Sequence, residues 1–449
     1  MSSAADPLPG LLIVVPVVIV ACRAGAAVCR RLGQPPVVGE LATGILLGPS
    51  LLGWLWPEGQ AWLFPSAIGP YTGALGQLGL LIFMFLVGLE LDLGSLRGHG
   101  RTAVVVSQVS IALPLLLGAA LAAGMYGTLA PEGTHRLPFI LFIAVAMSIT
   151  AFPVLARILT DRGLYGTRLG ALAMTSAAID DVTAWCLLAV VVAVTRSGSP
   201  LDAVTTAALS AVFFAFMLYV VRPVLARWAA RAARIATPRP VAGAAASGPG
   251  SAGRDSLVLV VLFAGLCLSA FATDRIGVHA LFGAFVFGVM TPRGSLAVER
   301  CATRLHAVAV PLLLPLFFVH TGLHTDIGML VGDPVQWLWA GAVLAVAVLG
   351  KWGGSAVAAR ACGQSWPGAL SLGALMNCRG LTELVILNIG LELHVIGPDL
   401  FTMLVLMALI TTAITSPALT WLRRRTRPAG GPDRPSIYEG LHTPVRNQE

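Results

Sequence analysis

Charge is scarce in this chain of 449 residues: only 11% of the residues are Asp, Glu, Lys or Arg, and the mean hydropathy is +0.84. Soluble domains carry about 25% charged residues, so this composition excludes an ordinary soluble globular protein. Apolar runs recur along almost the whole length, and about 20 apolar residues are enough for a helix to cross a bilayer core of roughly 30 Å. The sequence therefore predicts an all-α polytopic membrane protein that is embedded in the lipid bilayer.

Cysteines are also few, and no nucleotide-binding motif follows the last apolar run. The seven cysteines are scattered without a Cys-x-x-Cys pair, which indicates neither a metal site nor a disulfide framework. No nucleophile elbow is found, and no Gly-x-Gly-x-x-Gly follows the last apolar run. We therefore expect no cofactor, no metal, no nucleotide-binding domain and no enzymatic activity.

The apolar periodicity predicts thirteen transmembrane helices. They are placed at residues 10–30, 36–53, 72–92, 102–124, 138–158, 169–195, 203–222, 255–273, 277–291, 304–323, 336–359, 368–390 and 399–421. The first lacks a basic leader before it and a small-residue cleavage site after it, so we interpret it as a retained helix rather than a signal peptide.

Arginine is unevenly divided between the two sets of alternating connections. One set, together with the C-terminal tail, carries 23 arginines, whereas the other carries only Arg136, Arg196 and Arg275. The positive-inside rule then places the N-terminus outside and the C-terminus in the cytoplasm of a cell membrane. This distribution explains the net charge of +8 without a nucleic-acid partner.

The longest connection, residues 228–254, begins with arginines and becomes rich in Ala, Gly, Ser and Pro, which is the composition of a flexible linker. We expect it to join two halves of a transmembrane domain at 1–425, which a cytoplasmic tail follows at 426–449. The halves look related, because Gly88–Leu96 and Gly322–Leu330 share five residues at identical spacing. These segments end helices that are seven apart and therefore oppositely oriented, which predicts an inverted repeat.

Corresponding helices of the two halves contain helix-breaking residues. The fifth span contains Ser148-Ile149-Thr150 before Pro153, whose missing N–H is expected to free the Ile149 carbonyl as an oxygen ligand. The twelfth span contains Asn377 and Gly380. In transporters built from inverted repeats, interrupted helices bind ions near the midplane, so both segments are candidate sites of cation ligation. The alternative is that Pro and Gly are ordinary residues of transmembrane helices.

Asp180 and Asp181 lie together in the sixth span, and Lys351, the single lysine of the chain, lies in the eleventh. Each carboxylate costs at least about 2.5–3.5 kcal/mol at the centre of a membrane helix. Consecutive residues project about 100° apart, so one aspartate can face an ion while the other pairs with Lys351. A lysine, unlike an arginine, can release its proton, which favours a coupling role. A purely structural ion pair is the alternative, and it leaves one aspartate unexplained.

Hard oxygen ligands suit Na⁺ or another hard monovalent cation such as K⁺ or Li⁺. A single carboxylate that binds either a proton or a cation makes an exchanger, so we expect secondary active antiport of a monovalent cation against H⁺ by alternating access. A K⁺ efflux system or a gated cation channel is the second hypothesis. An intramembrane enzyme is a third, but the two carboxylates are adjacent on one helix and no metal-binding set accompanies them.

The chain resembles the monovalent cation:proton antiporter-2 family, which shares the sodium/hydrogen exchanger domain with bacterial Na⁺/H⁺ antiporters, Kef-type potassium-efflux systems and plant cation/H⁺ exchangers. The residues that carry the resemblance extend over most of the membrane region: Gly39–Pro49, Phe83–Leu91, Ser148–Val154, Asp180-Asp181, Gly350-Lys351 and Asn377–Gly380. The resemblance implies a homodimer of thirteen-helix subunits, with a dimer domain and a core domain that contains two crossed, broken helices.

The resemblance also implies roles for three residues: Asp181 binds the ion, Asp180 pairs with Lys351, and the Asp-Asp-Lys combination implies electrogenic exchange. Two features depart from the family pattern. The Kef-type members append a regulatory nucleotide-binding domain, and this sequence shows no such motif in its tail. Arg379 and Glu383 form a second possible intramembrane pair, four residues apart.

Overall fold

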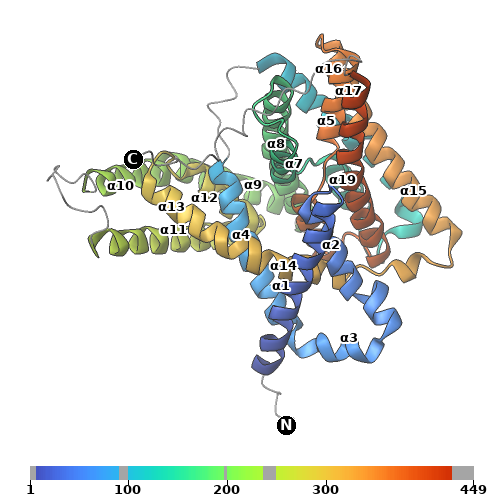
Figure 1. Ribbon diagram of the computed structural model, residues 1–449, viewed down its shortest axis with the longest axis horizontal. Helices are drawn as coiled ribbons and strands as arrows, with labels where there is room; N and C mark the ends of the chain where they lie inside the picture. The colour runs from blue at the N-terminus through green and yellow to red at the C-terminus, as the bar shows by residue number, and fades with distance from the viewer. Residues whose placement is uncertain (1–6, 91–99, 197–199, 236–248, 427–449) are drawn as a thin grey trace, which may run out of the picture.

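The computed structural model describes residues 7–90, 100–196, 200–235 and 249–426, and within these ranges it is helical and contains no strand (Figure 1). A helix satisfies its backbone hydrogen bonds within one segment, which a bilayer requires of a chain this apolar. The all-α prediction is confirmed. The tail from 427, residues 236–248 of the predicted linker, and residues 91–96 of the first repeat motif lie outside the described ranges.

Eleven helical segments of the described residues are long and apolar enough to span a membrane, and the bent pair α17 (Trp366–Met376) and α18 (Leu381–Glu392) brings the number to twelve. The predicted ninth span corresponds to α12 (Ala280–Met290), which at 11 residues is shorter than the other spans. Each of the thirteen predicted spans thus has a helical counterpart, but the count of thirteen stays a prediction.

The helices form two groups that pack more within themselves than with each other. The first group, here called the α4 bundle, consists of α1 (Leu8–Arg31), α2 (Pro36–Leu47), α4 (Gly69–Glu90), α9 (Pro200–Phe216), α10 (Arg222–Ile235), α11 (Pro249–Ile276), α12, α13 (Leu296–Val308) and α14 (Leu314–Leu323). The short helix α3 (Pro57–Leu63) joins α2 to α4. Figure 1 shows α10 to α13 at the left of this group.

The second group, the α8 bundle, extends from the centre to the upper right of Figure 1. It consists of α5 (Gly100–Leu129), α6 (Arg136–Ser148), α7 (Phe152–Asp161), α8 (Arg168–Arg196), α15 (Pro334–Val348), α16 (Gly354–Ala361), α17, α18 and α19 (Pro398–Thr426). The two halves of the sequence therefore contribute to both bundles, because each bundle contains helices from before and after the linker.

Glycines let helices of the α4 bundle approach closely. A Cβ at Gly288 of α12 would collide with the Phe85 carbonyl of α4, and one at Gly322 of α14 would collide with the backbone of Gly44 in α2. Small residues at such crossings are the usual means by which membrane helices pack without a hydrophobic driving force between them. The glycine-rich segments of the sequence thus serve helix packing around α4.

Candidate functional site

Two interrupted helices cross inside the α8 bundle. The first break separates α6 from α7 at residues 149–151, and the second separates α17 from α18 at residues 377–380 with a bend of 42°. The backbone N–H of Ala151 donates to the Cys378 carbonyl at 3.1 Å, so the two breaks bond to each other. Backbone groups that each break removes from a helix are in this way partly satisfied by the other break.

The position of the first break corrects the predicted role of Pro153. Pro153 lies in the first turn of α7, where its missing N–H removes no helical hydrogen bond, and the break falls before it. Ile149 and Ala151 have extended backbone (ψ 143° and 91°), so the chain has already left the helix before the proline is reached. Pro153 thus begins the second half-helix instead of interrupting a continuous one. Gly380 does lie in its break, directly before α18.

Two buried cations face the carbonyl end of α6. The Arg379 guanidinium donates to the carbonyls of Ala146 (3.1 Å) and Met147 (2.6 Å), and the Lys351 ammonium donates to the carbonyl of Ser148. The last carbonyls of a helix have no partner within it and carry partial negative charge. Arg379 and Lys351 therefore stabilise the C-terminal end of α6, where the first break begins.

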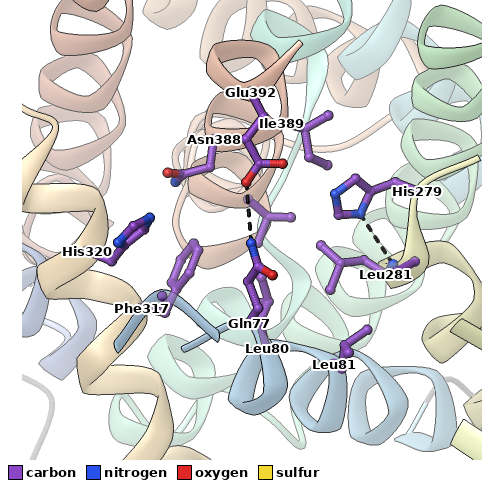
Figure 2. Close-up of a pocket in the computed structure, with 13 residues that line it drawn as sticks. Gln77, Leu80, Leu81, His279, Leu281, Phe317, His320, Asn388, Ile389 and Glu392 are labelled. Carbon is purple, nitrogen blue, oxygen red and sulfur yellow. Dashed lines mark hydrogen bonds between the residues drawn. The ribbon is translucent and has the colours of Figure 1, made fainter. Parts of the chain in front are cut away.

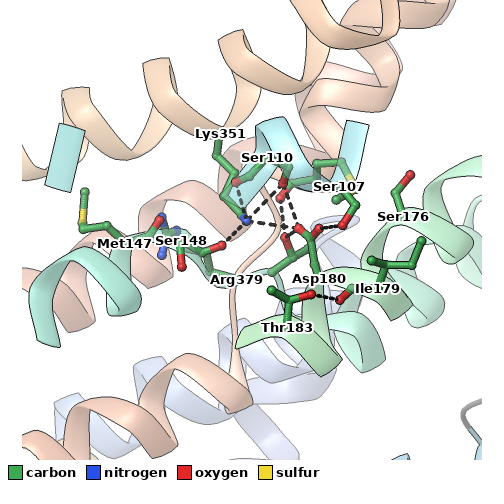
Figure 3. Close-up of polar contacts among 12 residues, drawn as sticks. Ser107, Ser110, Met147, Ser148, Ser176, Ile179, Asp180, Thr183, Lys351 and Arg379 are labelled. Atoms are coloured by element: carbon green, nitrogen blue, oxygen red, sulfur yellow. Dashed lines mark hydrogen bonds and ion pairs between the residues drawn. The ribbon is translucent and has the colours of Figure 1, made fainter. Parts of the chain in front are cut away.

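Asp180 is completely buried and fully engaged (Figure 3). Its carboxylate accepts hydrogen bonds from the hydroxyls of Ser107, Ser110 and Thr150, the last two at 2.8 Å each, and its Oδ2 lies 3.4 Å from the Lys351 ammonium. Three hydroxyl donors and one cation are the kind of compensation that a carboxylate needs at zero exposure. The predicted pairing of Lys351 with one member of the aspartate pair is found, and the member is Asp180.

Asp181 has the opposite surroundings. It is equally buried, yet neither of its carboxylate oxygens has a hydrogen-bond partner among the described residues. One turn further along α8, Trp185 stacks on Phe285 of α12, with ring centroids 6.1 Å apart. The helix that carries Asp181 thus meets the α4 bundle one turn from this carboxylate. Asp180 is thus paired with an opposite charge and three hydroxyls, whereas the one favourable side-chain neighbour of Asp181 is the indole of Trp185, which does not reach hydrogen-bond geometry.

Lys351 owes its position to a local widening of its helix. The π-helical turn η7 (Leu349–Gly353) separates α15 from α16 and contains Lys351. A Cβ at Gly350 would lie 3.1 Å from Cα of Pro114 in α5, so glycine permits the close approach of this turn to α5. Single π-helical turns inside α-helices are frequent at functional sites. From this turn the Lys351 ammonium reaches the carbonyl and the hydroxyl of Ser110 in α5, each at 3.2 Å.

Comparison with known proteins agrees with this architecture. The model of the family described as "Sodium/hydrogen exchanger, transmembrane" matches residues 17–425, which is most of the chain. The chain belongs to the sodium/hydrogen exchanger family. It is 42% identical over 392 residues to the Na⁺/H⁺ antiporter NhaS4 of Synechocystis sp., covering 86% of this chain and 90% of that protein. It is also 31% identical to the K⁺/H⁺ antiporter 1 of Saccharomyces cerevisiae, covering 92% of this chain but only 46% of that longer protein.

A solved structure shows the same fold as this exchanger-family chain. The sodium proton antiporter MjNhaP1 from Methanocaldococcus jannaschii superposes with a TM-score of 0.61 at 15% identity, covering 92% of this chain and 97% of that one. The similarity in fold is therefore much greater than the similarity in sequence.

The remaining predicted site residues lie at the crossing. The Ser148 hydroxyl donates to the Val145 carbonyl within α6, and Thr150 is held by Asp180. Ile149 lies in extended backbone between the half-helices. The Asn377 side chain is 1% exposed, and neither its oxygen nor its nitrogen has a partner among the described residues. Thus Asn377, like Asp181, is a buried polar group without compensation.

The second intramembrane pair of this exchanger-family protein is present as predicted. Arg379 and Glu383 are both fully buried, and their charged groups lie 2.7 Å apart. Arg379 precedes α18 and Glu383 lies in its first turn, where a carboxylate is favoured by the partial positive charge of the helix end. Because Arg379 already serves the end of α6, this pair links the two broken helices electrostatically.

Ser107 and Ser110 of α5 were not predicted from the sequence. They lie three residues apart and therefore on one face of their helix, and both donate to Asp180. Hydroxyls at this spacing inside an apolar span are the signal that points to them. No group of three or more His, Cys, Asp or Glu side chains that could hold a metal ion occurs among the described residues.

Proposed function

We propose that this member of the sodium/hydrogen exchanger family exchanges a monovalent cation for protons, with Asp181 as the group that binds either of them. The observation that supports this most is the contrast between the two aspartates. Asp180 has its charge compensated by three hydroxyls and Lys351, whereas Asp181 is buried without any such partner. A buried carboxylate of this kind gains most from a proton or from a cation, and it cannot hold both at once.

The cation ligands that accompany Asp181 in this proposal are oxygens at the crossing of the breaks. The candidates are the Asn377 side chain, the Ile149 carbonyl and the hydroxyls of Ser148 and Thr150. Asn377 is the strongest of these, because its amide is buried without a partner. Hard oxygen donors of neutral residues together with one carboxylate suit a singly charged cation, since no second carboxylate remains to balance a divalent one.

Lys351 is proposed as the coupling residue. A cation at Asp181 adds positive charge next to Asp180, and Lys351, the cation paired with Asp180, is then disfavoured as an ammonium. Release of its proton together with that of Asp181 gives two protons for one cation, which moves net charge across the membrane. Lysine permits this and arginine does not.

Alternating access is proposed as a movement of the α8 bundle against the α4 bundle. All the candidate ligands belong to the α8 bundle, and α8 meets the α4 bundle at the contact of Trp185 with Phe285. The α4 bundle, with the exposed apolar side chains of α9, is proposed as the dimer domain of a homodimer in the cell membrane. The N-terminus is proposed to lie outside and the C-terminus in the cytoplasm, as the arginine distribution favours.

Na⁺ is the favoured cation, because the relative with 42% identity and 90% coverage is named as a Na⁺/H⁺ antiporter. K⁺ is the second candidate, because another relative is named as a K⁺/H⁺ antiporter. The test uses proteoliposomes that contain a pH dye and are challenged in turn with Na⁺, K⁺ and Li⁺ at clamped voltage. Cation-dependent proton movement that is lost in Asp181→Asn supports the proposal. Cation flux without proton movement contradicts it and favours a channel.

A further inference from the structure

A second polar site lies outside the crossing, in a cavity of about 60 Å³ at the seam between the two bundles. Its walls come from α18 of the α8 bundle and from α4, α12 and α14 of the α4 bundle. Figure 2 shows its polar side chains gathered around one space: Gln77, His279, His320, Asn388 and Glu392. A volume of roughly 10–15 Å³ holds one water molecule, so the cavity admits a small ion with a few waters.

The lining is electrically one-sided. Glu392 is the one acidic residue among the lining residues, and they include no lysine or arginine. The connections on the predicted outer face, where α18 ends and α4 begins, carry only the arginines 136, 196 and 275. A cleft lined by one sign of charge concentrates counter-ions. The cavity therefore attracts cations and not anions.

Two oxygen ligands stand one helical turn apart on α18. The Asn388 amide nitrogen donates to the Leu384 carbonyl (2.8 Å) and to the Thr321 hydroxyl (2.9 Å). A carbonyl only accepts, so the group that faces Leu384 is the NH₂, and both of its protons are used. The Asn388 carbonyl oxygen is then the group left for a ligand, and Glu392 lies four residues later on the same face.

Glu392 is bonded across the seam by a weak donor. The Gln77 amide nitrogen of α4 lies 3.4 Å from its carboxylate, which is long for a hydrogen bond. Both side chains are exposed at the mouth of the cavity, whereas Asn388 and His320 are half-buried further in. A cation that reaches Glu392 competes with the Gln77 amide for the carboxylate.

We propose that this cavity is an outer access site for a hydrated monovalent cation, in which Glu392 and Asn388 supply the ligand oxygens and the ion displaces Gln77 from Glu392. The inference rests on the proposed exchange function and adds to it a binding step on one face of the membrane. Because Gln77 and Glu392 belong to different bundles, an arriving cation also removes a hydrogen bond that joins them. The absence of a three-residue metal cluster among the described residues favours a hard, partly hydrated ion over a transition metal.

The test compares the two faces of the membrane in vesicles. Right-side-out and everted vesicles that carry a pH dye give the half-saturating Na⁺ concentration for exchange at the outer and the cytoplasmic face. Glu392→Gln removes the charge and keeps the size. We expect the outer value to rise about fivefold or more, because one charged ligand is lost at a partly exposed site, and the cytoplasmic value to stay within about twofold of wild type.

Glu58→Gln of α3 is the matched control, since it removes the same charge from the same predicted face without lining the cavity. It is expected to change neither value. An equal shift at both faces in Glu392→Gln, a shift only in everted vesicles, or no shift overturns the outer access site. A shift of similar size in Glu58→Gln also overturns it, because the effect then comes from general surface charge.

Gln77→Leu provides a second variant that does not depend on the folding of Glu392→Gln. Removal of the competing amide leaves both ligand oxygens in place, so the outer half-saturating concentration is expected to fall, and a rise or no change contradicts the proposal. The two levels of inference separate cleanly. If wild-type vesicles show no exchange, the proposed function fails and the access site with it. If wild type exchanges but neither variant changes the half-saturating Na⁺ concentration at the outer face, the access site alone fails.

Discussion

Replacing Asp180 and Asp181 one at a time by asparagine removes the same charge from positions with opposite surroundings. Asparagine keeps the size of the side chain, so neither change opens a cavity. The structure predicts opposite outcomes for stability and activity. Asp180→Asn is expected to destabilise the fold, whereas Asp181→Asn is expected to abolish exchange and leave the fold intact.

The loss in Asp180→Asn follows from the partner that remains. Lys351 is fully buried, and without Asp180 its ammonium has no counter-charge within hydrogen-bonding distance. Breaking a buried ion pair by removing one member costs about 3–5 kcal/mol. The ammonium keeps Ser110 and the Ser148 carbonyl as acceptors, so we take the lower end, about 3 kcal/mol. At about 2.1 cal/mol/K of unfolding entropy per residue, a chain of 449 residues loses roughly 1 °C in Tm per kcal/mol, so the expected decrease in Tm is about 3 °C.

Asp181→Asn loses no hydrogen bond that the described residues make. The substitution replaces a buried group that is able to carry a charge by one that is always neutral. The free energy of unfolding is therefore expected to stay within about 1 kcal/mol of wild type or to rise. Exchange is expected to cease, because an amide neither takes up a proton nor supplies a charged ligand.

The assay combines thermal unfolding of the purified protein in detergent with dye-based exchange in proteoliposomes. Wild type in the same detergent and lipid is the reference for both variants. If Asp181→Asn unfolds well below Asp180→Asn, or retains wild-type exchange, then the assignment of the two carboxylates is reversed and the reasoning from their partners is refuted.

Three further outcomes are expected. Lys351→Arg keeps the charge and removes the titrating proton, so transport should become electroneutral or stop; a current on a supported membrane that equals wild type at an equal exchange rate would contradict the coupling role. Gly288→Ala places a Cβ against the Phe85 carbonyl and should lower the free energy of unfolding by about 1–3 kcal/mol. The control Gly341→Ala places a Cβ with nothing within 4 Å and should be neutral or stabilising. Equal effects of the two variants on thermal unfolding would show that the close crossing of α4 and α12 is unimportant. In a background without native reactive cysteines, Tyr165→Cys should react with impermeant thiol reagents from the cytoplasmic side and Glu58→Cys from outside, and labelling of both from one side would overturn the predicted topology.

Much of the fold was predictable because the bilayer imposes one rule on every segment. Each apolar run must be a helix, and the sequence alone located the short helix α12, which it predicts as a span at 277–291, although α12 has only 11 helical residues. The position of the breaks was less accurate. The sequence attributes the first break to Pro153, but the chain leaves the helix at Ile149, where Ala151 bonds to the second broken segment. That contact joins residues 227 positions apart (378 − 151), which no local pattern reveals.

The candidate site was likewise predictable only in part from the sequence. Adjacent aspartates had to face different directions by helical geometry alone, but the sequence does not state which one meets Lys351. That depends on where α5 places Ser107 and Ser110, and on the π-helical turn that holds Lys351. The resemblance to a family supplied the assignment that helical geometry left open. The cavity at Glu392 was missed because its residues come from four helices and form no motif.

The contacts of Asp180 have a consequence for the energetics of a transport cycle. All four of its partners belong to the α8 bundle: Ser107 and Ser110 on α5, Thr150 in the first break and Lys351 in η7. When this bundle moves as one piece, the distances from Asp180 to these partners do not change. The free energy of these interactions is then the same in the inward- and outward-facing states and cancels from the difference between them. Only groups at the seam, such as Trp185 against Phe285, have different neighbours in the two states. Evolution can therefore adjust the rate of the movement at the seam without altering the fixed charge that the cation encounters inside.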